Sequence, residues 1–173
     1  CVMAQQVLGG HGYVAEWGLE QNVRDARIAQ IYEGANGVQA LDLMGRKTVR
    51  ANGELLALLS EEMDAFVASQ AGVPAMQSYL VSLATCRKVL SDATGFVIES
   101  AASNPEEIGA ASYAYMELMG LTLYCFMWQR ILAAALADKD GDNAEYLDGL
   151  VKVGEFFLAR QVPRVHSLLA EIE

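Results

Sequence analysis

The chain has 173 residues, of which 53% are hydrophobic and 20% are charged, and its formal net charge at pH 7 is −10. This acidic balance excludes the basic surface that a nucleic-acid-binding protein needs. The three cysteines, at positions 1, 86 and 125, are odd in number and far apart in the sequence. This spacing excludes a disulfide framework and a zinc motif, and it favours a reducing, cytoplasmic compartment. We expect no metal site.

The first helical signal ends at a pair of glycines. Residues 1–8 have the pattern of the last turns of a helix, and Gly9-Gly10 stops it. Because the first residue is Cys rather than Met, we expect this start to be internal to a longer protein. Residues 9–18 contain four glycines, which is typical of a loop that needs positive φ angles or a close backbone approach.

A helix is predicted over residues 19–31, where apolar side chains recur at helical spacing. Tyr32-Glu33-Gly34 interrupts this pattern, and another helix is predicted from about Asn36 to Arg50. The Asn52-Gly53 pair then marks a turn and a change in composition.

Beyond this turn the sequence predicts four long helices with short connections. Their expected ranges are 54–70, 74–103, 105–137 and 144–172. Pro163 should kink the fourth helix, because proline lacks an amide proton and clashes with the preceding turn. Four such helices predict an antiparallel up-down-up-down bundle. The predicted fold is therefore all-α in two parts, a glycine-rich segment over residues 1–52 and a four-helix bundle over residues 53–173.

The most apolar stretch is Met119–Ala137. Gln129 and Arg130 interrupt it, so we interpret it as a buried helix rather than a membrane span. Its aromatic and methionine side chains predict a bundle core or an interface rather than a cofactor site. The residues concerned are Tyr113, Met116, Met119, Tyr124, Met127 and Trp128.

Glu33 lies between Tyr32 and Gly34, in the break between two predicted helices. One interpretation is a solvated loop acid. The other is a general base, because a carboxylate shielded from water can remove a weakly acidic proton. Gly34 would also let a substrate approach the backbone closely. These residues alone leave both interpretations open.

Two sequence elements resemble motifs of the acyl-CoA dehydrogenases. Gln6–Tyr13 is similar to Q-x-x-G-G-x-G-[YF], and Arg24–Gly34 is similar to R-D-A-x-I-x-x-I-Y-E-G, in the same order and at a similar separation. The resemblance to the common core of that family covers about residues 1–50. Glu16–Gly18 and Asn36–Lys47 resemble the branch with an extra C-terminal helical domain, which includes methylthiopropionyl-CoA dehydrogenases.

The resemblance implies that Glu33 is the catalytic base and that Tyr32, Glu33 and Gly34 contact the substrate. It also implies that the Glu33 backbone N–H binds the thioester carbonyl, as in an oxyanion hole. FAD would accept the β-hydride at N5. The product would be a trans-2-enoyl-CoA, as in fatty acid β-oxidation.

The resemblance also implies two sets of cofactor contacts. Gln6, Gly9 and Gly10 would reach across a dimer interface to the adenosine diphosphate part of the neighbouring subunit's FAD. Asn36 and Gly37 would be further cofactor neighbours. The family usually has Thr at the preceding position, where this chain has an alanine, so a hydroxyl contact is lost.

The partners implied by the resemblance are an acyl-CoA substrate, an electron-transfer flavoprotein or similar acceptor, and further copies of the chain in a homo-oligomer. The isolated chain lacks the upstream parts that carry most flavin and CoA contacts, so we expect it to be inactive and to retain no FAD. The alternative function is a helical assembly or interaction module without catalysis of its own.

Three aspartates resemble the first half of a calcium-binding loop: Asp138, Asp140 and Asp142. Asn143 stands where that loop needs glycine, and Gly149 where it needs glutamate. We therefore predict a solvated turn.

Overall fold

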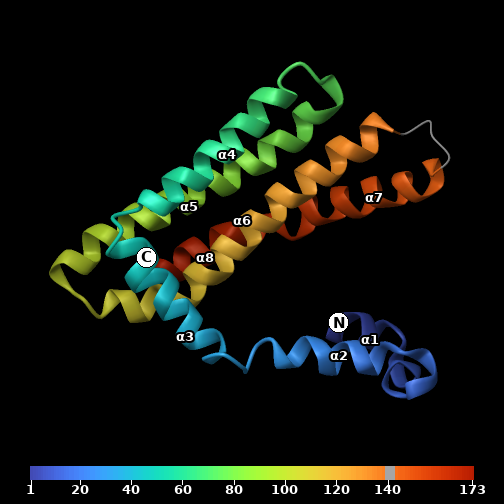
Figure 1. The fold of residues 1–173 in the computed structure, drawn as a ribbon, viewed down its shortest axis with the longest axis horizontal. Coiled ribbons are helices and arrows are strands. Elements are labelled where there is room, and N and C mark those ends of the chain that lie inside the picture. The colour runs from blue at the N-terminus through green and yellow to red at the C-terminus, as the bar shows by residue number, and fades with distance from the viewer. Residues whose placement is uncertain (139–142) are drawn as a thin grey trace. The chain divides into compact units, whose positions relative to one another are not determined.

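The computed structural model describes residues 1–138 and 143–173. Every regular element within these ranges is helical, which confirms the all-α prediction (Figure 1). The chain divides into two compact units, Cys1–Gln39 and Ala40–Glu173. The Asn52-Gly53 turn, where the composition of the sequence changes, lies inside the second unit. The boundary between the two compact units therefore does not fall at this turn.

The first unit is a short helical segment with almost no interior. Its elements are α1 (Val2–Val7), the 3₁₀ turns η1 (Gly9–Tyr13) and η2 (Ala15–Trp17), α2 (Leu19–Ile28) and most of α3 (Ala35–Leu41). Of residues 1–39, all of which the structure describes, only Gly12 is buried. Segments shorter than about 40 residues rarely form a stable core by themselves, so this unit needs other protein surface to bury its apolar side chains.

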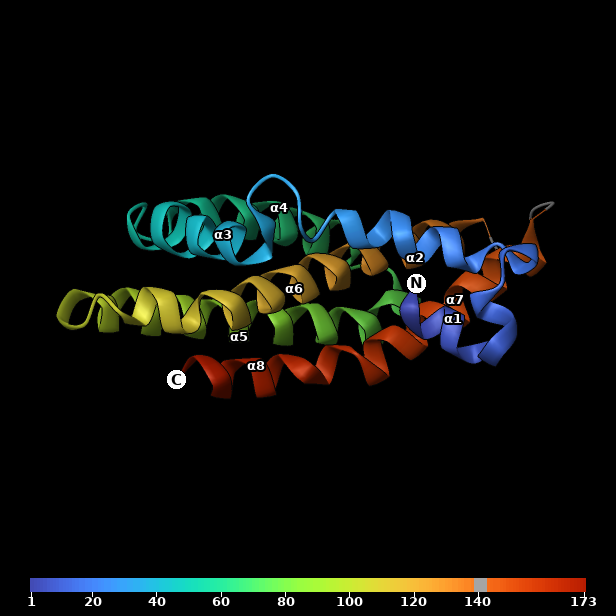
Figure 2. The same ribbon diagram turned by 90° about the horizontal axis from the view of Figure 1, so that it is seen from below.

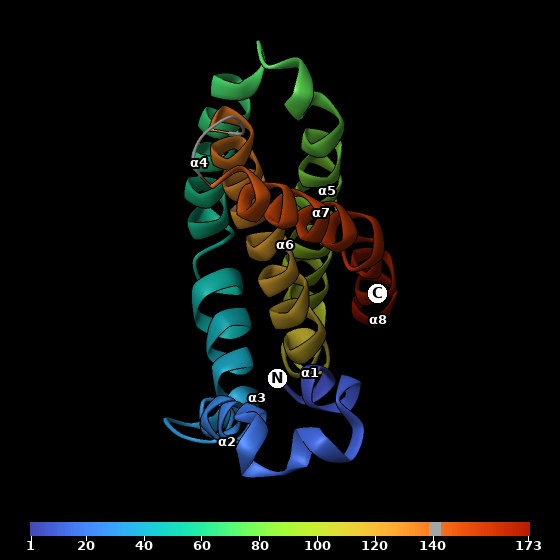
Figure 3. The same cartoon turned by 90° about the vertical axis from the view of Figure 1, so that its right-hand side faces the viewer.

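The second unit is the helical bundle. Its elements are η3 (Asp42–Val49), α4 (Glu54–Gln70), η4 (Pro74–Met76), α5 (Gln77–Ser103), α6 (Glu107–Ala137), α7 (Ala144–Arg160), η5 (Val162–Arg164) and α8 (Val165–Ile172). Helices α5, α6 and α8 pack against one another, as Figure 2 shows, and α7 packs against α6. The π-helical segment η3 and helix α4 follow one another along one side of the bundle (Figure 3).

Pro163 interrupts the fourth predicted helix. Helix α7 ends at Arg160, and the 3₁₀ turn that contains Pro163 leads into α8. The change of direction lets α8 pack against both α5 and α6. Val165, Leu168 and Ile172 of α8 are buried there.

Helix α6 is the central helix of the bundle. By length and composition alone it could cross a membrane. In the bundle it packs against η3, α5, α7 and α8, and Leu118, Cys125 and Leu132 are fully buried. This packing buries part of the apolar surface of α6, whereas other apolar side chains of the helix, such as Tyr124, are exposed.

A buried side-chain hydrogen bond joins two helices of the bundle. The Tyr115 hydroxyl of α6 lies 2.7 Å from Thr94 Oγ1 of α5. The Thr94 hydroxyl donates a 2.7 Å hydrogen bond to the Leu90 carbonyl, so Tyr115 is the donor to Thr94. Burial raises the pKa of the tyrosine. These bonds satisfy hydroxyls that would otherwise destabilise the core.

Two of the three cysteines meet in the core. Cys86 of α5 and Cys125 of α6 are fully buried and both are free thiols. Hydrogen bonding to Cys125, together with burial, raises the pKa of the Cys86 thiol. Sequence spacing gave no sign of this pair, because the contact depends on the packing of α5 against α6.

Helices α6 and α7 approach closely at one glycine. A Cβ atom at Gly154 would lie 2.9 Å from Leu132 Cδ2 and 3.1 Å from Trp128 Cε3, whereas one at Gly149 would meet nothing within 4 Å. We expect Gly154→Val to lower the free energy of unfolding by about 1–3 kcal/mol through overpacking. Gly149→Val is the matched control and should not destabilise the chain, because valine has a higher helix propensity than glycine. Thermal unfolding followed by circular dichroism tests this, and equal melting temperatures for the two variants would contradict it.

The extent of the bundle gives a second prediction. Met44 and Thr48 of η3 are buried in the second unit, so residues 40–173 should be more stable than residues 53–173. Removing η3 leaves the Met44 site empty, and the loss of a buried methionine side chain destabilises by about 2–5 kcal/mol. Both segments should unfold cooperatively, the shorter one at a lower temperature. Equal melting temperatures would show that η3 adds nothing to the bundle.

Candidate functional site

The break predicted at Tyr32-Glu33-Gly34 is a left-handed turn between α2 and α3. Three consecutive residues have positive φ angles: 53° at Glu33, 100° at Gly34 and 58° at Ala35. Glycine adopts this region freely. For other residues the left-handed conformation costs about 1–2 kcal/mol each, so the chain keeps Glu33 and Ala35 in a strained backbone. Such strain is common at functional sites.

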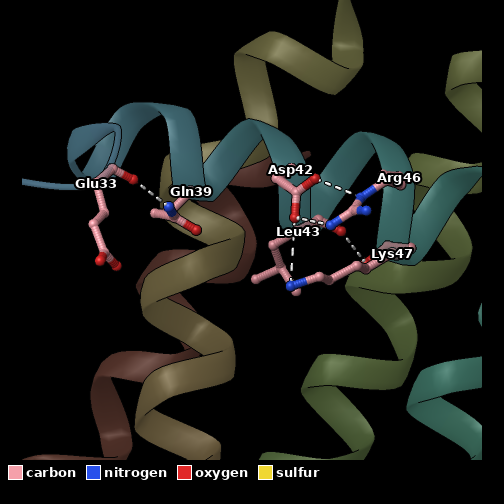
Figure 4. A network of polar contacts seen from close by, with 7 residues as sticks. Glu33, Gln39, Asp42, Leu43, Arg46 and Lys47 are labelled. Carbon is pink, nitrogen blue, oxygen red and sulfur yellow. Dashed lines mark hydrogen bonds and ion pairs between the residues drawn. The ribbon is translucent and has the colours of Figure 1, made fainter.

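Hydrogen bonds hold the turn on both sides. The Asn36 N–H donates to the Gln30 carbonyl at 3.2 Å, and the Ala35 N–H donates to the Tyr32 carbonyl at 3.3 Å. The side-chain amide of Gln39 donates to the Glu33 carbonyl at 2.8 Å (Figure 4).

Packing also restricts the turn. A Cβ atom at Gly34 would lie 3.2 Å from Val38 Cγ1. Both the positive φ angle and this close approach therefore favour glycine at position 34.

The Glu33 carboxylate is exposed and unpaired within the described parts of the chain. Its side chain extends away from Gln39 (Figure 4), and within the described parts of the chain it has no ion-pair or hydrogen-bond partner. The Glu33 N–H likewise donates to no carbonyl in those parts. Tyr32 beside it is 53% exposed. The turn thus presents an acceptor for a proton and a donor for a carbonyl oxygen on one residue.

The glycine-rich segment forms two 3₁₀ turns. Helix α1 ends before Leu8, Gly9 follows with a φ angle of 56°, and no atom lies within 4 Å of a Cβ placed at Gly9 or Gly10. Gln6, Gly9 and Gly10 are all exposed. Because no other atoms cover these residues, a ligand or the backbone of another protein molecule has room to approach them.

Gly12 is the position in this segment where close packing requires a glycine. A Cβ atom there would lie 2.2 Å from the Gln5 carbonyl oxygen, so only glycine allows η1 to fold back on α1. The prediction of cofactor contacts named Gly9 and Gly10 and overlooked this role. The His11 ring lies edge-on to Trp17, with 5.1 Å between ring centroids.

The two groups of candidate residues lie at opposite ends of α2. Helix α1 runs back along α2, so that Cys1 and Val2 share a groove of about 360 Å³ with Ala26 and Gln30. The glycine turns precede α2, whereas Glu33 follows it. The ten residues of α2 span about 15 Å. The structure therefore gathers Tyr32, Glu33 and Gly34 in one place but keeps them apart from the glycine turns.

Asn36 and Gly37, the other predicted cofactor neighbours, lie in the first turn of α3. Asn36 is half-buried and its N–H caps the turn through Gln30. Gly37 is exposed, with open space where a Cβ would lie. Both residues lie directly beside the Glu33 turn, so a ligand bound there could contact them.

The segment after α3 was expected to continue as an ordinary α-helix to Arg50. It is instead the π-helical segment η3, in which the Arg50 N–H donates to the carbonyl of Gly45 at 3.0 Å. The Thr48 hydroxyl donates to the Leu43 carbonyl at 2.9 Å. The prediction missed this wider turn because helical spacing of apolar residues does not distinguish it from an α-helix.

Charged residues of η3 pair with one another. Arg46 donates two hydrogen bonds to Asp42, at 2.6 and 2.9 Å, and Lys47 Nζ lies 3.4 Å from the same carboxylate (Figure 4). The bonds from Arg46, reinforced by Lys47, lower the pKa of Asp42. These side chains form a local surface network, and exposed pairs of this kind contribute little to stability.

Within residues 1–138 and 143–173, no group of three or more His, Cys, Asp or Glu side chains is placed to hold a metal ion. Asp140 and Asp142 of the calcium-loop comparison lie outside the described residues.

The sequence matches two family models. Residues 59–173 match the model described as "Acetyl-CoA dehydrogenase C-terminal like", and residues 2–48 match "Acyl-CoA dehydrogenase, C-terminal domain". The second match contains the Glu33 turn and the glycine turns. The first contains the bundle from Leu59 in α4 onward.

Curated relatives agree with these matches. A broad-specificity linear acyl-CoA dehydrogenase of Mycobacterium tuberculosis is 32% identical over 97% of this chain and 29% of its own length. A 3-methylmercaptopropionyl-CoA dehydrogenase of Ruegeria pomeroyi is 32% identical over 91% of this chain and 27% of its own length. The short-chain specific acyl-CoA dehydrogenase of Homo sapiens mitochondria is 52% identical over 42 residues, 24% of this chain and 10% of its own length.

The chain thus spans less than a third of the length of these relatives. The family models nevertheless match both the N-terminal segment and most of the bundle. The chain belongs to the acyl-CoA dehydrogenase family.

Proposed function

We propose that this chain is the C-terminal part of an FAD-dependent acyl-CoA dehydrogenase that converts an acyl-CoA to a trans-2-enoyl-CoA. The observation that carries the proposal is the free carboxylate of Glu33 on a strained left-handed turn, within the segment that matches the family. Strain of this kind supports a functional role, because folding alone would favour relaxing it.

In the proposed reaction, the Glu33 carboxylate removes a proton from the α-carbon of the thioester. The C–H bond breaks, the proton stays on Glu33, and negative charge develops on the thioester carbonyl oxygen. The Glu33 N–H, which has no partner in the described parts of the chain, would donate to that oxygen and stabilise the charge. When bound, FAD supplies the acceptor for the hydride that leaves the β-carbon.

The residues proposed to contact FAD fit one edge of a cofactor site. The exposed Gln6 side-chain amide can donate and accept hydrogen bonds. Gly9 and Gly10 leave open space at their α-carbons, which lets a diphosphate approach the backbone. Asn36 and Gly37 border the Glu33 turn. Because α2 separates the two groups, they would contact different parts of the cofactor or, as the family resemblance implies, the cofactors of two neighbouring subunits.

The exposed apolar side chains of the first unit support an assembled enzyme. Val2, Val7, Tyr13 and Trp17 are more than half exposed. Leu8, in the same segment, is half-buried. Such a surface favours association, and we propose that the remainder of the enzyme and a second copy of it cover these residues in a homo-oligomer.

The names of the relatives suggest probes for the substrate. They are described as acting on linear acyl-CoA, 3-methylmercaptopropionyl-CoA and butyryl-CoA. We propose a linear, unbranched acyl-CoA as substrate and an electron-transfer flavoprotein or similar protein as the electron acceptor. A reducing, cytoplasmic compartment suits the free thiols of the core.

A second function for the bundle is favoured by one observation. Along α6 a stripe of apolar side chains at helical spacing is exposed, although the opposite faces are buried. Its members are Tyr113, Leu123, Tyr124, Met127 and Ile131. The bundle would then be an assembly module that stabilises the oligomer, in addition to the catalytic role of the first unit.

The proposed base is tested by Glu33→Gln in the full-length enzyme. We expect FAD and butyryl-CoA to bind as in the wild type, and the rate of substrate-induced flavin bleaching to fall by roughly 10²–10⁴-fold, because the amide cannot accept the α-proton. Stopped-flow absorbance measures this rate. Glu16→Gln, which changes an exposed acid of η2, is the charge-matched control. If the Glu33→Gln rate is within a few-fold of the wild-type rate, Glu33 is not the catalytic base.

The isolated 173-residue chain should bind neither FAD nor acyl-CoA with useful affinity. Sites for small molecules bury roughly 70–90% of the ligand, whereas the candidate residues here, all exposed except the half-buried Asn36, lie on two separate surfaces of the first unit. Titration of FAD, followed by flavin fluorescence and by the protein's melting temperature, is the direct test. Saturable micromolar binding with a rise in melting temperature would show that this chain builds the cofactor site by itself.

A further inference from the structure

The left-handed turn at Glu33, Gly34 and Ala35 needs an external restraint. Two of its three residues carry a Cβ atom in a backbone region that L-amino acids avoid. The backbone bond from Ala35 to Tyr32 is long, at 3.3 Å. Without a further contact, rotation at Glu33 to a negative φ angle would relieve the strain.

Gln39 supplies that contact. It lies in α3, six residues after Glu33, and its Nε2 donates a 2.8 Å hydrogen bond to the Glu33 carbonyl oxygen (Figure 4). The bond fixes the peptide plane between Glu33 and Gly34. The same side chain approaches Gly34, since a Cβ placed there would lie 3.7 Å from Gln39 Nε2.

The φ angle of Glu33 sets how its carboxylate and its N–H are oriented relative to each other, and the carbonyl that Gln39 holds lies on the other side of the same Cα. Because the Asn36 N–H is bonded to the Gln30 carbonyl across the turn, holding the Glu33 carbonyl restrains rotation at Glu33. The backbone angles of a residue set the direction of its Cα–Cβ bond relative to its own N–H. Relaxing Glu33 to a negative φ angle would turn its carboxylate and its N–H relative to each other. The proton acceptor and the proposed donor to the thioester oxygen would then no longer meet the same substrate.

We infer that Gln39 is a positioning residue for Glu33: its side-chain amide holds the left-handed turn in the conformation that presents the carboxylate and the backbone N–H together. This inference rests on the proposed function, in which Glu33 is the base. Gln39 touches neither the substrate nor the reacting atoms in this role, and acts only through the Glu33 carbonyl.

The experiment uses the full-length enzyme with butyryl-CoA as the probe and flavin bleaching as the readout. Gln39→Met keeps an unbranched, uncharged side chain but removes the donor, whereas Gln39→Lys keeps a donor on a stem of similar length. Gln21→Met is the matched control, because Gln21 is also an exposed glutamine whose amide donates one hydrogen bond, to Asp25 at 2.7 Å.

We expect Gln39→Met to lower the limiting rate of flavin reduction on the order of ten- to a hundred-fold, as misplacement of a reacting group does. The half-saturating substrate concentration, the FAD content and the melting temperature should stay close to the wild-type values. Gln39→Lys should recover part of the rate, and Gln21→Met should match the wild type. A purely structural role would instead move the melting temperature or the FAD content together with the rate.

The two ideas fail in different ways. If Glu33→Gln abolishes turnover while Gln39→Met stays within two-fold of the wild type, the positioning role is wrong and the base assignment stands. If Glu33→Gln itself keeps a near-wild-type rate, the proposed function fails. In the double variant Glu33→Gln with Gln39→Met, the rate should equal that of Glu33→Gln alone, and a further independent loss would overturn the inference.

Discussion

The fold of the bundle depends on covering one helix that is apolar on almost every side. Helix α6 has 31 residues and buries side chains toward η3, α5, α7 and α8. A helix of this composition is stable in water only when neighbours approach it from several directions. The break at Pro163 and the glycine at position 154 are sequence features that make this possible, one by redirecting the chain and the other by removing a side chain from the contact.

The first unit, in contrast, buries very little of its own surface. Its helices are short and its apolar side chains are largely exposed, and only Gly12 is buried. The hydrophobic effect therefore gives this segment little stability of its own. A segment of this kind is suited to completing a site together with other protein surface, since the same exposed residues that leave it unstable alone provide the contacts in an assembly.

The Glu33 turn links this weakly packed segment to the proposed chemistry. Its backbone strain is local, and it is held by short-range hydrogen bonds. Because these restraints lie within a few residues of the turn, its geometry depends on the start of α3 rather than on a large core. Local restraint of this kind keeps a reactive group in place on an otherwise exposed surface.

The sequence by itself determined which segments are helical, where the glycines and prolines end them, and which family the segment around Glu33 resembles. The predicted range 54–70 coincides with α4, because amphipathic spacing and turn residues are local signals. Only the tertiary structure decided that η3 belongs to the bundle and that Cys86 lies beside Cys125, since both depend on packing between distant helices. The hydrogen bond from Gln39 to Glu33 was not predicted either. It depends on three consecutive residues with positive φ angles, which the spacing of hydrophobic residues does not indicate.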